Sequence, residues 1–486
     1  MNKMKVLIIG NGMVGHKAVE LLAEQHSGAI QVIGKEPRPA YDRVHLSSFF
    51  SGKTADDLSL VSSRFYQRHH IDAVLDCSVK DIDRSGKIVI STDDQEYSYD
   101  KLILATGSFP FVPPIPGKDQ SHCHVYRTIE DLLAIQASAQ NSRVGVVVGG
   151  GLLGLEAAKA LHDLGLQAHV VEFAPQLMAV QVDADGGQLL RSKIEALGVG
   201  VHTGKSTQEI VTGESCRYRM NFADQSFLET DMIVFSAGIR PEDNLARNAD
   251  LNVGERGGIE INQFCQTSDP DIYAIGECAL WSGRIFGLVA PGYEMASIAV
   301  NHILGQKDKH FNGTDMSTKL KLLGVDVASI GDAHGRTPDC CSLSWLDDET
   351  QVYKKVVLSQ DRKKLLGAVL VGDTDDYGQW LQLTLNQLDL PEQPESLVLP
   401  ESYRKKPVLN VAELPDDAQI CKCNRVSKGD ICNAIQSGCT DLSAITTATR
   451  AASTCGTCAS LVTQILETEI SPKRQDDFRQ VVGSPG

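Results

Sequence analysis

The sequence lacks the features of a membrane protein and of a nucleic-acid binder. It has no run of eighteen or more apolar residues, which excludes a membrane-spanning helix. Its 46 basic side chains are outnumbered by 62 acidic ones, for a formal net charge of −16. Such a charge repels phosphate at long range, so neither nucleic acid nor an anionic membrane is an expected partner.

The sequence also lacks a secretory leader before its first apolar run, at residues 6–9, and we therefore expect a cytoplasmic chain. Thiols are kept reduced in the cytoplasm, so the thirteen cysteines are not expected to form a disulfide framework. Some of them should instead hold a metal or carry out redox chemistry. A length of 486 residues with 42% hydrophobic side chains predicts three or four globular domains.

The amino-terminal segment predicts a βαβ unit that binds a dinucleotide. The apolar run at residues 6–9 leads into Gly10-Asn-Gly-Met-Val-Gly15, then a helical pattern, then a second apolar run that ends near Glu36. The glycines allow a tight turn, close approach of a diphosphate and close helix packing. The diphosphate then meets the free N–H groups of a helix N-terminus. The candidate residues for this site are Gly10, Gly12, Gly15 and Glu36.

The same arrangement returns farther along the chain. An apolar run at residues 144–148 precedes Gly149-Gly-Gly-Leu-Leu-Gly154, and Glu172 follows the next apolar run. A carboxylate there accepts both ribose hydroxyls of NAD and repels the 2′-phosphate of NADP. We therefore expect NADH at Gly149, Gly151, Gly154 and Glu172. The alternatives are glycines that serve a turn alone and a solvent-exposed glutamate.

Three more apolar runs end in small residues that leave room for a ligand. They end at Thr106-Gly107, at Gly238 and at Gly276-Glu277. Two dinucleotide sites in one chain indicate one tightly held cofactor and one that exchanges, in the order of flavoprotein reductases with FAD first. We assign Thr106, Gly107, Gly276 and Glu277 to FAD, with Glu277 on a ribityl hydroxyl, and Gly238 to NADH. For Glu277, an acid at a helix N-terminus is the alternative.

Four cysteines near the carboxyl end form two close pairs, Cys421-Lys-Cys423 and Cys455-Gly-Thr-Cys458. Four thiolates are what an iron–sulfur cluster or a structural zinc needs. The one-residue gap of the first pair favours [2Fe–2S] over zinc, and zinc, a disulfide or free thiols remain alternatives. The other nine cysteines are predicted to be packing residues, including Cys278, Cys432 and Cys439.

Residues 40–50 contain no cysteine, although flavin disulfide reductases carry a redox cysteine pair soon after the first βαβ unit. A thiol relay is therefore excluded at this place, and electrons should leave the flavin by another route. The cysteine quartet is the expected acceptor.

Together these segments resemble the amino-terminal half of the large subunit of bacterial NADH-dependent assimilatory nitrite reductase. They are similarly close to the flavin electron-transfer subunit of assimilatory nitrate reductases. The resemblance extends from residue 4 to about residue 470. It rests on both glycine fingerprints, the cysteine quartet and the motifs at residues 37–47, 276–278, 319–327 and 331–337.

The resemblance implies an α/β, glutathione-reductase-like flavoprotein with two dinucleotide-binding domains. A small α+β domain and a helical [2Fe–2S] module like bacterioferritin-associated ferredoxin would follow it. The resemblance also implies that Arg43 contacts FAD, and Ser48 stands where many related reductases carry a lysine near the flavin. Glu156, in the first turn of the helix after the second fingerprint, is the candidate for positioning the nicotinamide.

The expected domain boundaries follow from these motifs and from a concentration of prolines after residue 390. They are 1–120 with 255–308 for FAD, 121–254 for NADH, 309–390 for the α+β domain, 391–420 for a proline-rich linker, 421–470 for the cluster module and 471–486 for a disordered tail.

The expected function is electron transfer from NADH through FAD and [2Fe–2S] to a nitrite-reducing sirohaem domain or subunit, or to a nitrate reductase. Sirohaem and [4Fe–4S] are not expected on this chain, which offers no further cysteine cluster. A homodimer is compatible with the sequence. The rival functions are an NADH oxidase with structural zinc, and a module that docks on an iron-storage or assembly partner.

Charge indicates where the acceptor would dock. Residues 421–486 hold seven basic and six acidic side chains, so the acidic excess lies elsewhere in the chain. Lys422, Arg425 and Lys428 flank the first cysteine pair, and we expect the partner to meet them.

Overall fold

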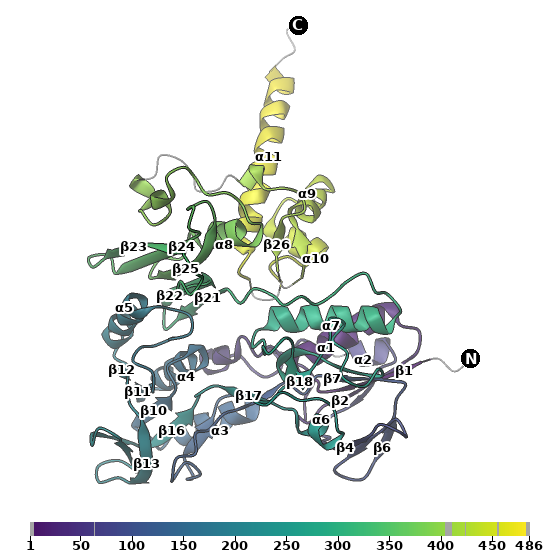
Figure 1. The fold of residues 1–486 in the computed structure, drawn as a ribbon, viewed down its shortest axis with the longest axis vertical. Coiled ribbons are helices and arrows are strands. Elements are labelled where there is room, and N and C mark those ends of the chain that lie inside the picture. The colour runs from purple at the N-terminus through teal and green to yellow at the C-terminus, as the bar shows by residue number, and fades with distance from the viewer. Residues whose placement is uncertain (1–3, 63, 404–410, 423, 454–455, 483–486) are drawn as a thin grey trace. The chain divides into compact units, whose positions relative to one another are not determined.

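The computed structural model describes residues 4–62, 64–403, 411–422, 424–453 and 456–482 (Figure 1). The chain forms two compact units. Unit 1 holds Met1–Phe173 and Lys205–Thr314, and unit 2 holds Ala174–Gly204 and Asp315–Gly486. None of the helices formed by the described residues is both long enough and apolar enough to cross a membrane.

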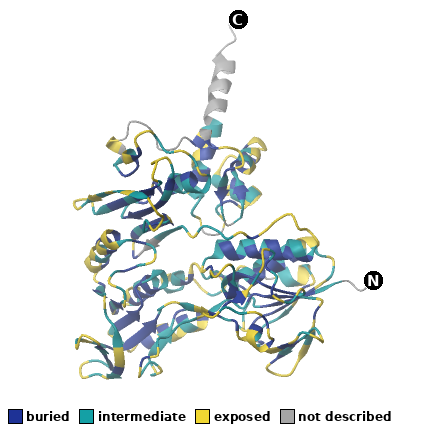
Figure 2. Ribbon diagram, in the orientation of Figure 1, coloured by how far each residue is buried: buried dark blue, intermediate teal, exposed yellow. Residues whose placement is uncertain are grey.

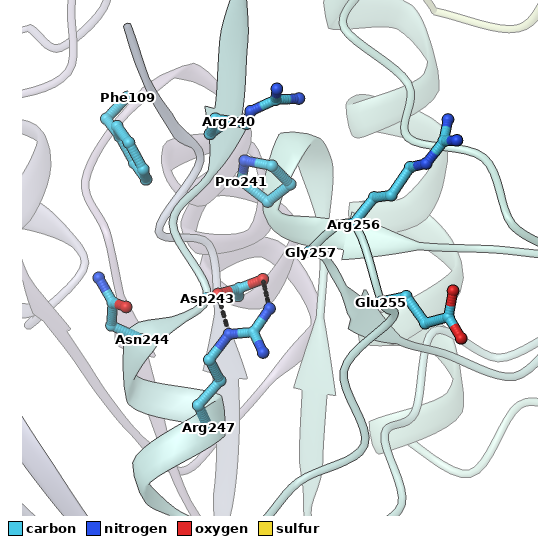
Figure 3. Close-up of a pocket in the computed structure, with 9 residues that line it drawn as sticks. All are labelled: Phe109, Arg240, Pro241, Asp243, Asn244, Arg247, Glu255, Arg256 and Gly257. Atoms are coloured by element: carbon cyan, nitrogen blue, oxygen red, sulfur yellow. Dashed lines mark hydrogen bonds and ion pairs between the residues drawn. The ribbon is translucent and has the colours of Figure 1, made fainter. Parts of the chain in front are cut away.

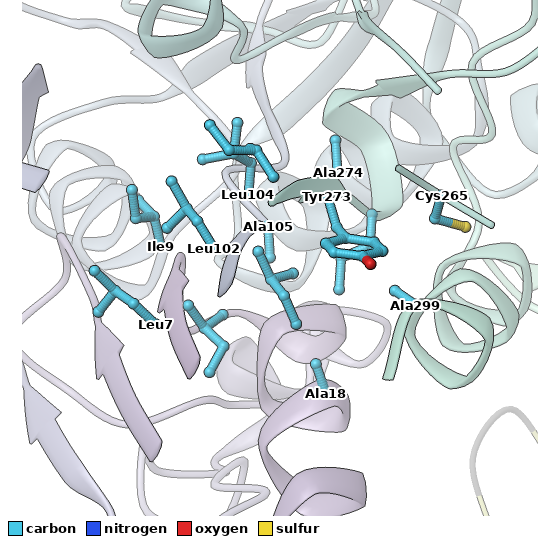
Figure 4. Packing of buried hydrophobic residues seen from close by; sticks show 14 of the residues in the cluster. Leu7, Ile9, Ala18, Leu102, Leu104, Ala105, Cys265, Tyr273, Ala274 and Ala299 are labelled. Carbon is cyan, nitrogen blue, oxygen red and sulfur yellow. The ribbon is translucent and has the colours of Figure 1, made fainter. Parts of the chain in front are cut away.

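The first sheet of unit 1 is parallel, with strand order β19-β7-β1-β2-β3. Its strands are short apolar runs, as is typical of strands covered on both faces. Figure 2 shows them as buried, and Figure 4 shows strand side chains such as Leu7 and Leu102 in one cluster with Ala18 and Ala299 of two helices. The two helices, α1 (Met13–Gln25) and α7 (Val289–Ile303), lie side by side. The strands are β1 (Lys5–Ile9), β2 (Ala29–Ile33), β3 (Asp72–Val74), β7 (Lys101–Leu104) and β19 (Ile272–Ala274).

The second sheet of unit 1 repeats this plan, with parallel neighbours in the order β11-β10-β16-β9. As in the first sheet, the chain passes from a central strand through a glycine turn into a helix and then into the adjacent strand. These elements are β9 (Cys123–Val125), β10 (Val144–Val148), β11 (Gln167–Val171), β16 (Met232–Phe235), α3 (Ile129–Ala139) and α4 (Leu152–Asp163).

Smaller elements complete unit 1. They are two antiparallel three-stranded sheets, two strand pairs and short helices. Their bounds are β4 (Val79–Asp83), β5 (Ile88–Ser91), β6 (Glu96–Ser98), β13 (Thr207–Thr212), β14 (Tyr218–Phe222), β15 (Phe227–Thr230), β8 (Ser108–Pro110), β17 (Ile239–Pro241), β18 (Ile259–Glu260), β20 (Ala279–Leu280), η1 (Leu46–Ser51), η2 (Gly276–Cys278), α2 (Phe65–Arg68) and α6 (Asn244–Asn248).

Unit 2 is built on an antiparallel sheet with strand order β21-β22-β25-β24-β23. The segment 174–204, expected in the NADH-binding domain, groups with this sheet. Asp183 caps its helix and accepts bonds from Tyr353 Oη at 2.8 Å and Lys355 Nζ at 2.9 Å. These elements are β21 (Thr318–Leu322), β22 (Val325–Gly331), β23 (Cys341–Asp347), β24 (Val352–Leu358), β25 (Leu365–Val371), α5 (Ala184–Ala196), β12 (Gly200–His202) and α8 (Tyr377–Leu385).

A helical module completes unit 2. Its core contains Ile431, Ile445 and Val462, one from each of three helices. The last helix extends to Val482, whereas the sequence predicted a tail without regular structure from Ser471, where the composition turns polar. The elements are β26 (Gln419–Cys421), β27 (Val426–Ser427), α9 (Lys428–Gln436), α10 (Leu442–Thr449) and α11 (Ala459–Val482).

The proline-rich segment is anchored at both ends. Leu397, in the 3-10 helix η3 (Pro394–Leu397), packs in the core under α8, whereas Val411 of η5 (Val411–Glu413) packs in the core of the module. Between them lies a further short helix, η4 (Glu401–Tyr403). The module also meets α8 directly, because Gln382 Nε2 donates to Gln419 O at 3.2 Å. The described ends of this segment and Gln382 therefore hold the module against α8.

A buried cluster of charged side chains gives a test of the stability of unit 2. Lys354, 3% exposed, lies 2.6 Å from Asp373 and 2.7 Å from Asp376. Lys354→Met removes the ammonium that lies between these two carboxylates, and we expect the free energy of unfolding to fall by about 3 kcal/mol. Urea unfolding followed by circular dichroism measures this. Lys364→Met, which breaks the more exposed Lys364–Asp389 pair, should change it little, and equal losses would contradict the prediction.

Candidate functional site

The residues expected to hold FAD come together at one edge of the first sheet. Gly10 follows β1, Glu36 follows β2, Thr106 and Gly107 follow β7, and Gly276 opens η2 shortly after β19. Since these strands are parallel neighbours, their carboxyl ends lie on the same side of the sheet. This edge is where doubly wound sheets bind nucleotides.

The three glycines of the first fingerprint have different surroundings. A Cβ on Gly10 would lie 2.1 Å from the carbonyl oxygen of Ala105, and one on Gly15 would lie 1.9 Å from that of Gly10. A Cβ on Gly12 would meet only Arg43 Nε, at 4.0 Å. The outer glycines therefore bring helix and strands into contact, and the middle one borders open space.

The second fingerprint has the same geometry. A Cβ on Gly149 would lie 2.2 Å from Ser236 O and one on Gly154 would lie 1.9 Å from Gly149 O, whereas one on Gly151 would meet no atom within 4 Å. Helices α1 and α4 begin at Gly12 and Gly151 without a side-chain cap. Their first N–H groups can therefore bind a diphosphate, and both cradles fit that group.

Glu36 and Arg43 are joined at the FAD edge. Tyr41 Oη donates to Glu36 Oε2 at 2.6 Å, and Arg43 donates to the other carboxylate oxygen. Arg43 also donates to the carbonyl oxygen of Arg127 at 3.0 Å, and its guanidinium lies 4.7 Å from the Tyr41 ring centroid. Arg43 is thereby held beside the Gly12 cradle.

Glu277 lies in a polar network that the sequence did not indicate. Its Oε2 accepts from Ser108 Oγ and from Arg127 Nη2, both at 2.6 Å. Thr106 Oγ1 donates to Glu242 O at 2.5 Å, next to the strand pair β8–β17. Ser108 and Arg127 belong to segments without a fingerprint, so only the folded chain identifies them.

Glu172 and Gly238 lie at the edge of the second sheet. The carboxylate of Glu172 accepts from the N–H of Gly150, inside the glycine loop. Gly238, after β16, has φ +106°, and a Cβ at this position would meet no atom within 4 Å. The left-handed backbone there favours glycine, and the space beside it stays open.

Glu156 lies in the first turns of α4, which packs against η1. Burial raises the pKa of Glu156 to about 7, and the charge of His45 partly offsets this. His45 Nδ1 lies 2.7 Å from Asp42 Oδ2, and the hydrogen bond raises the pKa of His45. Tyr126 is 3% exposed, and its hydroxyl has no hydrogen-bond partner among the described residues. The sequence did not single out His45 or Tyr126.

The described half of the cysteine quartet lies in the helical module. Cys421 ends β26 and is 2% exposed, and Cys458 precedes α11, where its carbonyl oxygen accepts from the N–H of Val462 at 2.9 Å. Cys421 belongs to the core of the module, and Cys458 is partly buried and packs against that core. Cys423 and Cys455 lie outside the described residues, so their assignment stays a prediction.

The two cysteine-bearing loops are tied together. Asn424 Nδ2 donates to Arg450 O at 2.8 Å and to Ser453 Oγ at 3.1 Å. Arg450 and Ala452 have φ of 65° and 62°, in the left-handed region. Thiolates beside the N-terminus of α11 are favoured by the positive end of its dipole. This chemistry fits a thiolate-bound cluster.

The expectation for Lys428 is wrong. Its Nζ donates to Ala412 O at 2.9 Å and to Leu414 O at 2.7 Å, and the residue is 6% exposed. The capping box of Ser427 and Asp430 begins α9 here, which places Lys428 in the first turn. The ammonium of Lys428 is therefore not accessible to a protein that docks on the module.

The remaining cysteines form no disulfide with one another or with the described members of the quartet. Cys278 is fully buried, and burial raises the pKa of its thiol. Cys432 and Cys439 pack against the core of the module. No group of three or more acidic, histidine or cysteine residues in the described ranges could hold a metal ion, and those ranges include only two of the quartet.

A cavity of about 580 Å³ lies on unit 1, where Arg247 forms an ion pair with Asp243 (Figure 3). None of the residues lining it is a predicted site residue. They are Phe109, Arg240, Pro241, Asp243, Asn244, Arg247, Glu255, Arg256 and Gly257.

Three protein families match successive parts of the chain. Residues 4–302 match pyridine nucleotide-disulphide oxidoreductase, residues 317–387 match the rubredoxin NAD+ reductase C-terminal domain, and residues 419–468 match the BFD-like [2Fe-2S] binding domain. The flavoprotein-like fold with a cluster module, expected from the sequence, is confirmed.

Several curated relatives match almost the whole chain, and two of them are described here. The nitrite reductase (NADH) large subunit of Escherichia coli (strain K12) is 56% identical over 97% of this chain and 56% of its own length. The assimilatory nitrate reductase electron transfer subunit of Bacillus subtilis (strain 168) is 37% identical over 96% of this chain and 60% of its own. The resemblance seen in the motifs is confirmed, and the chain spans little more than half of these relatives.

Solved structures share the fold. A ferredoxin reductase from Rhodopseudomonas palustris superposes with a TM-score of 0.73 at 23% identity, over 82% of this chain and 98% of that one. At this identity the likeness shows the fold alone.

The unequal surroundings of the glycines give a paired test. Gly151→Ala enters open space, so we expect a folded protein that binds the dinucleotide more weakly, by about tenfold or more. Gly154→Ala would place its Cβ against Gly149 O, so we expect a lower melting temperature. Calorimetry measures both quantities. Similar melting temperatures for the two variants would contradict the assigned roles.

Proposed function

This chain belongs to the pyridine nucleotide-disulphide oxidoreductase family, and on that premise we propose that it carries electrons from NADH through FAD to a [2Fe–2S] cluster. The observation that carries the proposal is the pair of glycine cradles at the edges of two parallel sheets, together with the paired cysteines of the module. The missing cysteine pair at residues 40–50 supports an exit through the module instead of through a thiol relay.

At the FAD edge, Gly12 would border the diphosphate, and the N-terminus of α1 would neutralise part of its charge. Glu36 would accept the adenosine ribose hydroxyls, with its carboxylate oriented by Tyr41 and Arg43. Glu277, already oriented by Ser108 and Arg127, would hold a ribityl hydroxyl. These bonds fix each carboxylate before the ligand arrives, which lowers the entropy cost of binding.

At the second edge, Gly151 would border the diphosphate of NADH, and Glu172 would accept its ribose hydroxyls. Glu156, farther along α4, faces the segment that carries η1 and would position the nicotinamide. When bound, FAD accepts the hydride of NADH as two electrons and can release them singly to the cluster. The residues of the two edges would orient these groups toward each other.

In the module, Cys421, Cys423, Cys455 and Cys458 would ligate the cluster, with the clamp from Asn424 holding their loops together. We propose that the acceptor is a nitrite-reducing sirohaem domain or subunit, following the name of the relative from Escherichia coli. The second candidate is a nitrate reductase, following the name of the relative from Bacillus subtilis. The cysteines without disulfides suit a cytoplasmic protein.

Removing one cluster ligand tests the electron path. Cys458→Ser should remove the iron–sulfur absorption and reduce NADH-driven reduction of a one-electron protein acceptor at least about tenfold, because the flavin loses its exit. Anaerobic bleaching of the flavin by NADH should persist. Cys439→Ser, in the same module, is the matched control and should keep both reactions. If Cys458→Ser lost flavin bleaching and electron transfer to the same extent, the separate roles of the flavin and the cluster would be refuted.

Reversing the charge at the ribose tests the nucleotide preference. Glu172→Arg should raise kcat/KM for NADPH relative to NADH by about tenfold or more, since a guanidinium pairs with the 2′-phosphate that the carboxylate repels. Steady-state kinetics with both nucleotides measures the ratio. Glu209→Arg, an exposed change on β13, controls for added charge. An unchanged ratio of kcat/KM for the two nucleotides in Glu172→Arg would show that this residue does not determine the nucleotide specificity.

A further inference from the structure

The cavity on unit 1 is bordered by more basic than acidic side chains (Figure 3). Arg240, Arg247 and Arg256 line its volume of about 580 Å³, together with the acids Asp243 and Glu255. Pockets that bind small molecules in proteins have volumes of about 300–1,000 Å³. The size of this cavity therefore suits a small organic ligand, and its charge suits an anion.

The charge of one of the two acids is already neutralised by the protein. Asp243 is buried, and its carboxylate accepts from Arg247 Nε at 2.8 Å and from Arg247 Nη2 at 3.2 Å. The same carboxylate accepts from the N–H of Gly258 at 2.6 Å. Asp243 and Arg247 thus form a satisfied wall, and the charge offered to a ligand comes from the other residues.

Two arginines of the cavity are left without a counterion. Arg240 and Arg256 are exposed, and neither forms an ion pair with a carboxylate of the described residues. Arg240 is held from β17 over Phe111, with its guanidinium 4.7 Å from the ring centroid. In Figure 3 both guanidinium groups lie in the upper part of the view, and Glu255 lies below them. Guanidinium groups bind phosphate oxygens in bidentate fashion.

An aromatic ring completes the cavity. Phe109 is 42% exposed and is the register partner of Arg240 in the antiparallel pair of β8 and β17, so the two side chains share one face. Ser108, the residue before it, turns to the other face and donates to Glu277 at 2.6 Å. The cavity therefore lies across the β8–β17 pair from the FAD edge and is separate from both glycine cradles.

We propose that this cavity is a third nucleotide site, which binds a nucleoside phosphate with its base on Phe109 and its phosphates on Arg240 and Arg256. An exposed aromatic ring stacks on any nucleobase, and two unpaired guanidinium groups neutralise a diphosphate. Glu255 opposes the anion and limits its affinity. The site goes beyond the proposed electron transfer and does not depend on it.

The test uses the complete flavin-loaded chain and isothermal titration calorimetry, with ADP as the probe in saturating NAD+. The flavin and NAD+ then occupy the two cradles, so the heat of ADP binding reports on the cavity. Arg256→Ala, an exposed change in a loop, should raise the Kd of ADP by about tenfold or more, because a charge-assisted contact is lost. Glu255→Gln should lower that Kd. Lys80→Ala, which removes an exposed lysine paired with Asp94, is the matched control and should leave it unchanged.

Inorganic pyrophosphate separates the base from the phosphates. Phe109→Ala should weaken ADP and leave pyrophosphate unchanged, whereas Arg256→Ala should weaken both probes. ADP that binds without NAD+ but not in its presence would occupy the NADH cradle, which would overturn the third site and support the proposed one. The inference would also be overturned by an equal Kd of ADP in the native protein and Arg256→Ala.

Discussion

Close contact between backbone atoms at glycine determines where both proposed nucleotide sites lie. Gly15 meets the carbonyl oxygen of Gly10, and Gly154 meets that of Gly149, so each helix begins directly above the end of its strand. Any side chain at these positions would push the helix away from the sheet. Because the helices stay in place, their uncapped first turns and the open cradles of Gly12 and Gly151 point at the same region. The backbone alone defines the position of each cradle, and the carboxylates and arginines lie around that position.

Much of this arrangement could be predicted from the sequence, because it depends on local chemistry. Gly10, Thr106 and Gly276 each follow an apolar run, and parallel strands bring such ends to one edge. The same holds for Gly149, Glu172 and the second sheet. Turn chemistry and strand length are properties of a few adjacent residues, so they can be recovered without the fold.

Other features could not be predicted because they depend on residues far apart in the chain. The proximity of His45 to Glu156 requires η1 and α4 to pack together, and nothing in either segment encodes that contact. Lys428 belongs to a basic stretch, but its ammonium donates hydrogen bonds to two carbonyl groups of the preceding segment. Asp183 fixes its segment to β24 through Tyr353 and Lys355. In each case tertiary packing overrode the local pattern.

The anchoring of the cluster module has a mechanical consequence. Leu388 packs against both cores of unit 2, and Gln382 is bonded to the strand that ends at Cys421. A cluster that had to travel between donor and acceptor would therefore drag the five-stranded sheet with it, or first break these contacts. The hydrodynamic drag on such a carrier would be that of a full domain. The rate of any gated electron delivery would accordingly depend on solvent viscosity.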